Sequence, residues 1–135
     1  MSLKNVLIID DSKLDAILAK KILEKHQFAD NVLLFERAMD ALDYLKAFDL
    51  GRLNDFPQVI FLDVLMPEMN AQSFLENFLK LPASLRKDVT FVIMSSAIQT
   101  EIDENAFANY PHKIFFISKP ISEDVLQKVH ILYRA

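Results

Sequence analysis

Cysteine is absent from this chain of 135 residues, and glycine occurs once, at Gly51. The lack of cysteine excludes disulfides, thiolate metal sites and cysteine nucleophiles. A phosphate-binding loop or a dinucleotide-binding fingerprint needs several glycines, because the backbone must approach the phosphates closely. The sequence therefore excludes nucleotide binding of those two kinds.

Long hydrophobic runs are also missing. The apolar run at 6–9 is too short for a signal peptide and ends in two aspartates. No run approaches the roughly 18 apolar residues of a membrane span. The net charge is −4 and no predicted helix carries a basic stripe, so the charge pattern gives no reason to expect nucleic acid. A hydrophobic content of 52% excludes disorder, and we expect one cytoplasmic domain.

Five short apolar runs alternate with segments of helical spacing. The runs lie at 6–9, 32–35, 59–62, 91–94 and 114–117. Strict alternation of strand and helix predicts parallel βαβ units, whose crossovers are right-handed. The sequence therefore predicts an α/β fold, with a five-stranded parallel sheet covered by helices on both faces. Periodicity alone does not give the order of the strands.

The connecting helices follow from the same spacing. We expect the first helix to pack one apolar face on the sheet. That face consists of Leu14, Ile17, Leu18 and Ile22. The second helix presents Ala38, Ala41, Leu42 and Leu45 in the same way. A third helix over 71–81, a weaker and more polar fourth over about 100–109 and a last helix over about 122–133 complete the pattern.

Polar side chains stand at the ends of four predicted strands. They are Asp10 and Asp11 after the first, Asp63 after the third, Ser95 and Ser96 after the fourth, and Lys119 after the fifth. These ends share one edge of a parallel sheet, and the order 2-1-3-4-5 would place the three carboxylates side by side. Because three such charges repel, a divalent cation is the natural neutraliser, and an all-oxygen site favours Mg²⁺ or Mn²⁺ over zinc. Lys119 would then counter a dianion brought beside Asp63.

Each of these features also has a purely structural explanation. Two aspartates after a strand serve as a strand exit and a helix cap, a Lys-Pro pair is an ordinary loop, and two serines make a turn. Asp63 is the hardest to explain in this way, because a doubly buried strand should not end in a carboxylate without a use. The conjunction of polar groups at four strand ends therefore predicts a site.

The same motifs resemble the receiver domain of two-component response regulators. The shared features are Asp-Asp after the first strand, Asp-x-x-Met-Pro after the third, a small hydroxyl residue after the fourth and Lys-Pro after the fifth. The resemblance covers residues 4–134. It implies a flavodoxin-like, doubly wound sheet in the order 2-1-3-4-5.

The resemblance also implies a role for individual residues. Asp63 would be the phosphoacceptor, and Lys119 would pair with the phosphoryl group. Asp10 and Asp11 would bind Mg²⁺ together with Asp63 and the backbone carbonyl of Leu65. The switch residues would be Ser95 and Phe116. The bond between Lys119 and Pro120 is expected to be cis.

Some positions depart from the usual pattern of the family. Ala71, preceded by Asn70, stands where the family usually has glycine, which bears on the turn there. A serine replaces the commoner threonine at the switch, and the adjacent Ser96 is an alternative to Ser95.

Two further positions bear on the lifetime of the phosphorylated state. In the family that the chain resembles, the residues two positions after the acceptor and two after the switch hydroxyl flank the approach of the attacking water, and here they are Leu65 and Ala97. Neither can orient a water for attack on the phosphorus, which predicts slow self-dephosphorylation. If Ser96 were the switch residue, Ile98 would take the place of Ala97.

The function implied is phosphoryl transfer to this chain from a phosphohistidine of a sensor histidine kinase or phosphotransfer protein. The chain would not be a turnover enzyme on a separate substrate. Its phosphorylation would be read by an unknown downstream protein on a face formed by the predicted fourth helix at about 100–109, the fifth strand at 114–117 and the last helix at about 122–133. Tyr110, Phe116 and Ile131 belong to that predicted face. We expect no contact with nucleic acid and no membrane insertion.

Alternatives concern both the extent of the chain and its chemistry. With no output domain before Ala135, a stand-alone messenger or relay intermediate is expected, and an excised domain is the alternative. A receiver-like module that binds partners without phosphorylation is a rival function, although the complete acidic site argues against it. A haloacid dehalogenase-type phosphatase is another, but it needs a second aspartate where Ser12 stands.

Overall fold

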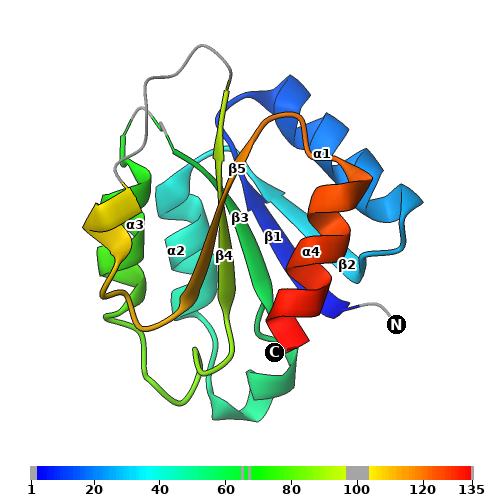
Figure 1. Cartoon of the computed structure of the whole chain (residues 1–135). Coiled ribbons are helices and arrows are strands. Elements are labelled where there is room, and N and C mark those ends of the chain that lie inside the picture. The colour runs from blue at the N-terminus through cyan, green and yellow to red at the C-terminus, as the bar shows by residue number, and fades with distance from the viewer. Residues whose placement is uncertain (1–2, 65, 67, 97–103, 135) are drawn as a thin grey trace.

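One parallel sheet forms the centre of the molecule (Figure 1). The computed structural model describes residues 3–64, 66, 68–96 and 104–134. Within them the strands are β1 (Leu3–Ile9), β2 (Ala29–Phe35), β3 (Val59–Asp63), β4 (Thr90–Ser95) and β5 (Lys113–Ser118). All neighbouring strands run parallel, in the order β2-β1-β3-β4-β5. The predicted fold and the strand order implied by the resemblance are both confirmed.

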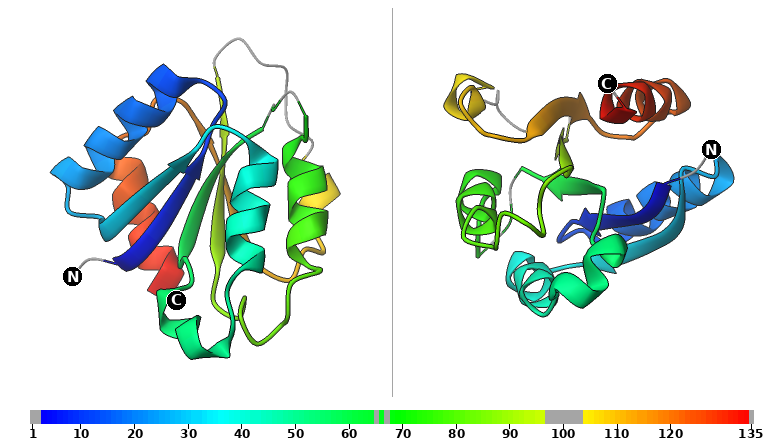
Figure 2. Two further views of the ribbon diagram at one scale, coloured as in Figure 1. Left: turned by 180° about the vertical axis from the view of Figure 1, so that it is seen from behind. Right: turned by 90° about the horizontal axis from the view of Figure 1, so that it is seen from below.

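Helices cover both faces of this sheet. In the described residues the α-helices are α1 (Lys13–Lys25), α2 (Ala38–Lys46), α3 (Ala71–Phe78) and α4 (Glu123–Arg134). Two 3-10 helices, η1 (Leu50–Asp55) and η2 (Glu104–Phe107), lie in the connections. α1 and α4 pack on one face, and α2 and α3 pack on the other (Figure 2). No helix in the described part of the chain is long and apolar enough to cross a membrane.

The central strands β1 and β3 are buried on both faces. In β1, Leu7 and Ile9 belong to the core on the α2–α3 side, whereas Val6 and Ile8 belong to the core on the α1–α4 side. Successive residues of a strand point to opposite faces, so both sets must be apolar here, which explains the unbroken apolar runs. The residue that follows such a strand emerges at the edge of the sheet.

The predicted packing face of α1 is wrong except for Ile22, which is partly buried against the core on the α1–α4 side. The helix buries Ala16, Ala19 and Leu23, whereas Leu14 is 67% exposed and Leu18 is 49% exposed. Both sets have helical spacing, so the sequence offered two candidate faces. Alanine allows a close approach of helix and strands, so packing on the sheet selects the face with the smaller side chains. Larger apolar side chains are therefore left on the outside.

The helices α2 and α3 follow the prediction more closely. The expected residues Ala38, Ala41, Leu42 and Leu45 are all buried. α3 starts after the Asn70 N-cap, whose Oδ1 accepts a hydrogen bond from the Ser73 N–H at 2.8 Å, and ends at Phe78, before the predicted residue 81. Ala71 takes the place of the family's glycine as the first residue of α3, so no special backbone conformation is needed there.

The predicted fourth α-helix is wrong for its described part. Residues 104–107 form η2, and bonds of the 3-10 type continue from the Ala108 N–H to the Asn105 carbonyl and from the Tyr110 N–H to the Phe107 carbonyl. Phe107 is partly buried on the core and the other side chains of η2 are exposed, so the segment lacks the apolar stripe that stabilises a longer helix. The remainder of the predicted helix lies outside the described residues.

Candidate functional site

The carboxyl edge of β1 and β3 brings three carboxylates together. β1 and β3 pair in parallel with Ile9 opposite Leu62, so the residues that follow in each strand direction, Asp10 and Asp63, reach the edge side by side. Asp10 is 1% exposed and Asp63 is 3% exposed. One carboxylate oxygen from each of these two residues and from Asp11 lie within 4.8 Å of one another. The geometry is that of an oxygen-only cation site.

Asp63 is electrostatically perturbed in this cluster. Its Oδ1 atom is buried and has no hydrogen-bond partner among the described residues. Burial, followed by the negative charge of Asp10, raises the pKa of Asp63 to about 7, although Lys119 acts in the opposite direction. A buried carboxylate with a raised pKa and an oxygen that lacks a hydrogen-bond partner is unusual for a purely structural residue. A bound cation would neutralise its charge.

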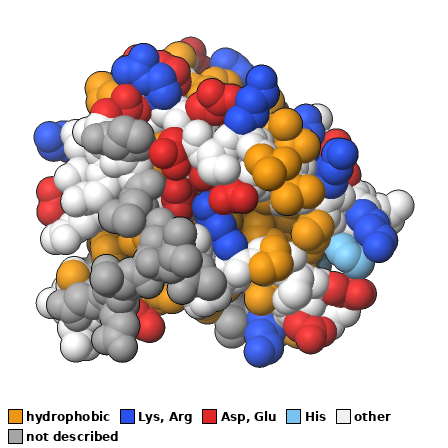
Figure 3. All heavy atoms as spheres, turned by 90° about the horizontal axis from the view of Figure 1, so that it is seen from above, with side chains coloured by type: hydrophobic (Ala, Val, Ile, Leu, Met, Phe, Trp, Pro, Cys, Tyr) orange, Lys and Arg blue, Asp and Glu red, His pale blue; other side chains and the backbone are white. Residues whose placement is uncertain are grey.

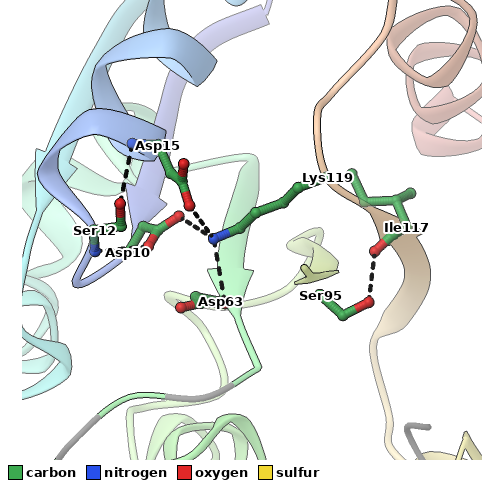
Figure 4. A network of polar contacts seen from close by, with 7 residues as sticks. All are labelled: Asp10, Ser12, Asp15, Asp63, Ser95, Ile117 and Lys119. Atoms are coloured by element: carbon green, nitrogen blue, oxygen red, sulfur yellow. Dashed lines mark hydrogen bonds and ion pairs between the residues drawn. The ribbon is translucent and has the colours of Figure 1, made fainter. Parts of the chain in front are cut away.

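Lys119 supplies the positive charge of the site. Its Nζ lies 2.7 Å from Asp10 Oδ2, 3.1 Å from Asp15 Oδ2 and 3.5 Å from Asp63 Oδ1 (Figure 4). Burial lowers the pKa of Lys119, but hydrogen bonds to Asp10 and Asp15 outweigh it and the net change is upward. The Lys119 N–H donates to the Ser95 carbonyl at 2.7 Å, and the bond to Pro120 is cis, as expected from the resemblance.

The sequence reasoning missed Asp15. This residue lies in the first turn of α1, and its contact with Lys119 joins positions 104 residues apart. The only signal in the sequence is an acidic residue in a helical turn that starts at the same edge of the sheet. Its significance depends on the phase of α1, which the sequence analysis assigned wrongly.

The predicted switch residues lie at the ends of β4 and β5. The Ser95 Oγ donates a weak hydrogen bond of 3.5 Å to the Ile117 carbonyl, so in Figure 4 it is directed toward β5 and not toward Asp63. Ser96 lines a cavity beside Lys119. Phe116 is half-buried against Phe107 of η2, with ring centroids 5.6 Å apart. Leu65 and Ala97 lie outside the described residues.

The other members of the predicted output face do not form one surface. Tyr110 is half-buried, and its hydroxyl donates to the Leu75 carbonyl of α3 at 2.8 Å. Phe116 packs on the same core as Tyr110. Ile131 is 67% exposed but borders a cavity with His26 and other residues at the end of α1. The structure therefore groups Tyr110 with Phe116 and leaves Ile131 apart from them.

An apolar surface borders the acidic cluster. We name the outward residues Leu14, Ile17 and Leu18 the α1 patch; all three are at least 36% exposed. A cavity of about 260 Å³ continues from Leu18 to Lys119 and Pro120. Viewed from above, hydrophobic side chains gather next to acidic and basic side chains at this edge (Figure 3). A charged site is thus directly adjacent to a surface that can bury an apolar partner.

The sheet and its charged edge define a flavodoxin-like α/β domain with an acidic pocket at the switch point of the strand order. The chain belongs to the response regulator receiver domain family, whose model matches residues 6–130. A receiver protein from Dyadobacter fermentans has 30% identity and a TM-score of 0.80, with 97% of this chain and 98% of that chain covered. A response regulator from Cytophaga hutchinsonii has the same fold, with a TM-score of 0.80, 20% identity, and 99% and 98% covered.

A curated relative places this similarity within a longer protein. The chain is 31% identical over 120 residues to a protein-glutamate methylesterase/protein-glutamine glutaminase of Yersinia pseudotuberculosis. The match covers 89% of this chain but 31% of the relative, so the chain spans about a third of that protein's length. The similarity therefore concerns the receiver portion. Receiver domains are phosphoacceptors as a family.

Proposed function

We propose that residues 4–134 form a receiver domain in which Asp63 accepts a phosphoryl group from a phosphohistidine. The donor is a sensor histidine kinase or a histidine phosphotransfer protein in the cytoplasm. The observation that carries this proposal is the Asp63 carboxylate itself. It ends a central strand, its Oδ1 has no hydrogen-bond partner among the described residues, and Lys119 Nζ lies 3.5 Å away. A nucleophile beside a fixed positive charge is what phosphoryl transfer requires.

The transfer step uses one oxygen of Asp63. That oxygen attacks the phosphorus and forms a P–O bond while the P–N bond to the donor imidazole breaks. The electron pair of the broken bond leaves on the imidazole nitrogen, and the product is an aspartyl phosphate. Lys119 offsets the charge on the phosphoryl oxygens during transfer. The carboxylate must be ionised to attack, which the raised pKa of Asp63 opposes in the absence of a cation.

The residues present fit Mg²⁺, with Mn²⁺ as an alternative. Asp10, Asp11 and Asp63 offer only carboxylate oxygens, and an oxygen donor set suits these hard cations and not zinc. When bound, Mg²⁺ neutralises the acidic cluster and stabilises charge on the transferring group. The backbone carbonyl of Leu65 is the further ligand expected from the resemblance, and it lies outside the described residues.

The phosphodonor docks on the α1 patch in this proposal. The donor histidine must reach Asp63 in line with the breaking bond, so the docking surface has to border the acidic cluster. Leu18 meets that condition, because it is exposed and lines the same cavity as Asp10 and Lys119, and Leu14 extends the exposed apolar surface along the same helix. Their apolar character fits a partner helix that presents an apolar stripe around its phosphohistidine.

The signal leaves the site through the ends of β4 and β5. Added charge on Asp63 would draw the hydroxyl of Ser95 from the Ile117 carbonyl, and Phe116 would respond because it lies on β5, which leads directly into Lys119. We assign the downstream partner to the surface around η2 and β5, where Phe107 and Phe116 pack together. Slow loss of the phosphoryl group would suit a relay intermediate or a long-lived mark.

The two rival functions have less support from the geometry. A phosphatase of the haloacid dehalogenase type needs an acid at position 12, where Ser12 instead caps α1 and its N–H donates to Asp10 Oδ1 at 2.9 Å. A module that only binds partners has no need for a buried carboxylate oxygen without a partner.

The direct test is incubation with phosphoramidate or acetyl phosphate and Mg²⁺, followed by intact mass measurement. We expect the wild type to gain one phosphoryl group and Asp63→Asn to gain none. Asp43→Asn, which changes an exposed aspartate on α2, is the matched control and should behave as the wild type. An unchanged mass for the wild type, or full labelling of Asp63→Asn, would refute the proposed function.

A further inference from the structure

Asp15 is the fourth carboxylate at this edge, and neither the cation site nor the acceptor role involves it. The first turn of α1 fixes its backbone, because its N–H donates to the Ser12 Oγ at 3.3 Å. From there its Oδ2 accepts a hydrogen bond from Lys119 Nζ at 3.1 Å. Its side chain is 41% exposed, whereas that of Lys119 is 14% exposed. The ion pair thus joins a fixed helix end to the loop after β5, at the rim of the site.

The ammonium of Lys119 is shared among three carboxylates. Asp10 is nearest at 2.7 Å, Asp15 follows at 3.1 Å, and Asp63 is the farthest at 3.5 Å. Only Asp10 and Asp15 accept hydrogen bonds from this ammonium, whereas Asp63 Oδ1 has no hydrogen-bond partner among the described residues and interacts with it through charge alone. A phosphoryl group on Asp63 would attract the same nitrogen, which the hydrogen bonds to Asp10 and Asp15 now hold at 3.5 Å from Asp63 Oδ1, so a move toward the phosphoryl group has to weaken one of these two bonds.

The exposure of the two carboxylates indicates which of them loses its ion pair with Lys119. Asp10 is 1% exposed, and its Oδ1 is held by the Ser12 N–H at 2.9 Å, so losing Lys119 would leave a buried charge with less compensation. Asp15 is exposed enough for water to replace the lysine. Its ion pair is therefore the weaker one and the first to break.

We propose that Asp15 is a positioning residue that competes with the phosphoryl group for Lys119. It holds the ammonium toward the rim before transfer, and the phosphoryl group must displace it to gain the lysine. This inference rests on the proposed function. Two effects of the Asp15 charge act in the same direction: it occupies one ammonium hydrogen, and it repels an incoming dianion at the entrance. Neutralising Asp15 should therefore make phosphorylation faster.

The experiment compares Asp15→Asn with the wild type in two measurements made with Mg²⁺. One is the rate of phosphorylation by phosphoramidate, and the other is the dissociation constant of beryllofluoride, a phosphoryl mimic, by ¹⁹F NMR. We expect the rate to rise and the dissociation constant to fall by about two- to fivefold, the range of a partly exposed ion pair. Asp15→Glu, which keeps the charge, should restore values close to those of the wild type.

Matched variants separate this role from a general effect of charge. Glu24→Gln removes one negative charge from an exposed position of the same helix and should change neither quantity. In a Lys119→Met background, Asp15→Asn should have no further effect, because the lysine through which Asp15 acts is absent. In the metal-free protein, the ¹⁵N resonance of the Lys119 ammonium should change in Asp15→Asn and stay constant in Glu24→Gln.

The outcomes distinguish this inference from the proposed function. If the wild type accepts a phosphoryl group but Asp15→Asn reacts at the same rate or more slowly, Asp15 does not compete for the lysine. An accelerating effect that persists in the Lys119→Met background would also refute the role, because the charge would then act without the lysine. Failure of the wild type to accept any phosphoryl group would overturn both proposals.

Discussion

The raised pKa of Asp63 makes the stability of the metal-free protein depend on pH. The folded protein holds this proton up to a pKa of about 7, whereas an unfolded chain releases it near 3.8. Between these values the folded state binds more protons, so the free energy of unfolding falls as the pH rises through 7. The change in pKa corresponds to about 4 kcal/mol, at about 1.36 kcal/mol for each pH unit.

Asp63→Asn isolates this contribution, because asparagine keeps the shape of the side chain without a titrating proton. We expect the variant to have nearly the stability of the wild type at pH 4 and to exceed it by about 2–4 kcal/mol at pH 8. Urea denaturation in a chelator, followed by circular dichroism at several pH values, measures the difference. Circular dichroism is the suitable signal since the chain has no tryptophan.

Mg²⁺ provides the second half of the same experiment. At 100 times its dissociation constant, a bound ligand stabilises the folded state by about 2.7 kcal/mol. The cation should therefore recover much of the loss at pH 8 in the wild type and have little effect on Asp63→Asn. Asp43→Asn should follow the wild type throughout. Parallel stability curves for the wild type and Asp63→Asn across the pH range would refute the electrostatic reasoning.

Three other predictions concern separate parts of the structure. Tyr110→Phe removes the hydrogen bond to α3 and should cost about 1 kcal/mol of stability by urea denaturation, with an unchanged rate of labelling by phosphoramidate. Leu18→Gln should slow transfer from a phosphohistidine protein but not from phosphoramidate, whereas the exposed and remote Leu50→Gln should slow neither; equal effects of the two variants would exclude the α1 patch as the docking surface. Leu65→Asn combined with Ala97→Glu should speed loss of the phosphoryl group, measured by intact mass over time, and an unchanged decay would show that these positions do not set its lifetime.

The fold could be predicted because its signals are local. Runs such as 59–62 are apolar at every position, and only a strand covered on both faces needs that pattern. Asp63 directly follows this run, so it must lie at the edge of the sheet. The same reasoning applied to the run at 6–9 predicts Asp10 and Asp11 at the same edge, and the strand order implied by the family resemblance then places them beside Asp63.

The errors arose where the sequence permits two solutions that only packing decides. In α1 the leucine face and the alanine face have the same spacing, and the sheet selected the smaller side chains. Asp15 was missed for the same reason, since its contact with Lys119 depends on that choice. At residues 104–107 the sequence predicts part of an α-helix, but this polar segment has no fully buried side chain and forms only the 3-10 helix η2.

The packing of α1 through its alanines has a consequence for how this protein can diverge. Ala16 and Ala19 occupy the space against the sheet, so the outward residues Leu14 and Leu18 contribute little to the interior. Substitutions at the outward positions change what the surface presents while the fold loses little stability. Duplicated copies of such a gene could therefore acquire different phosphodonors by a few changes on one helix, without any compensating change in the core. The close approach of helix and sheet thus separates the evolution of partner choice from the evolution of the fold.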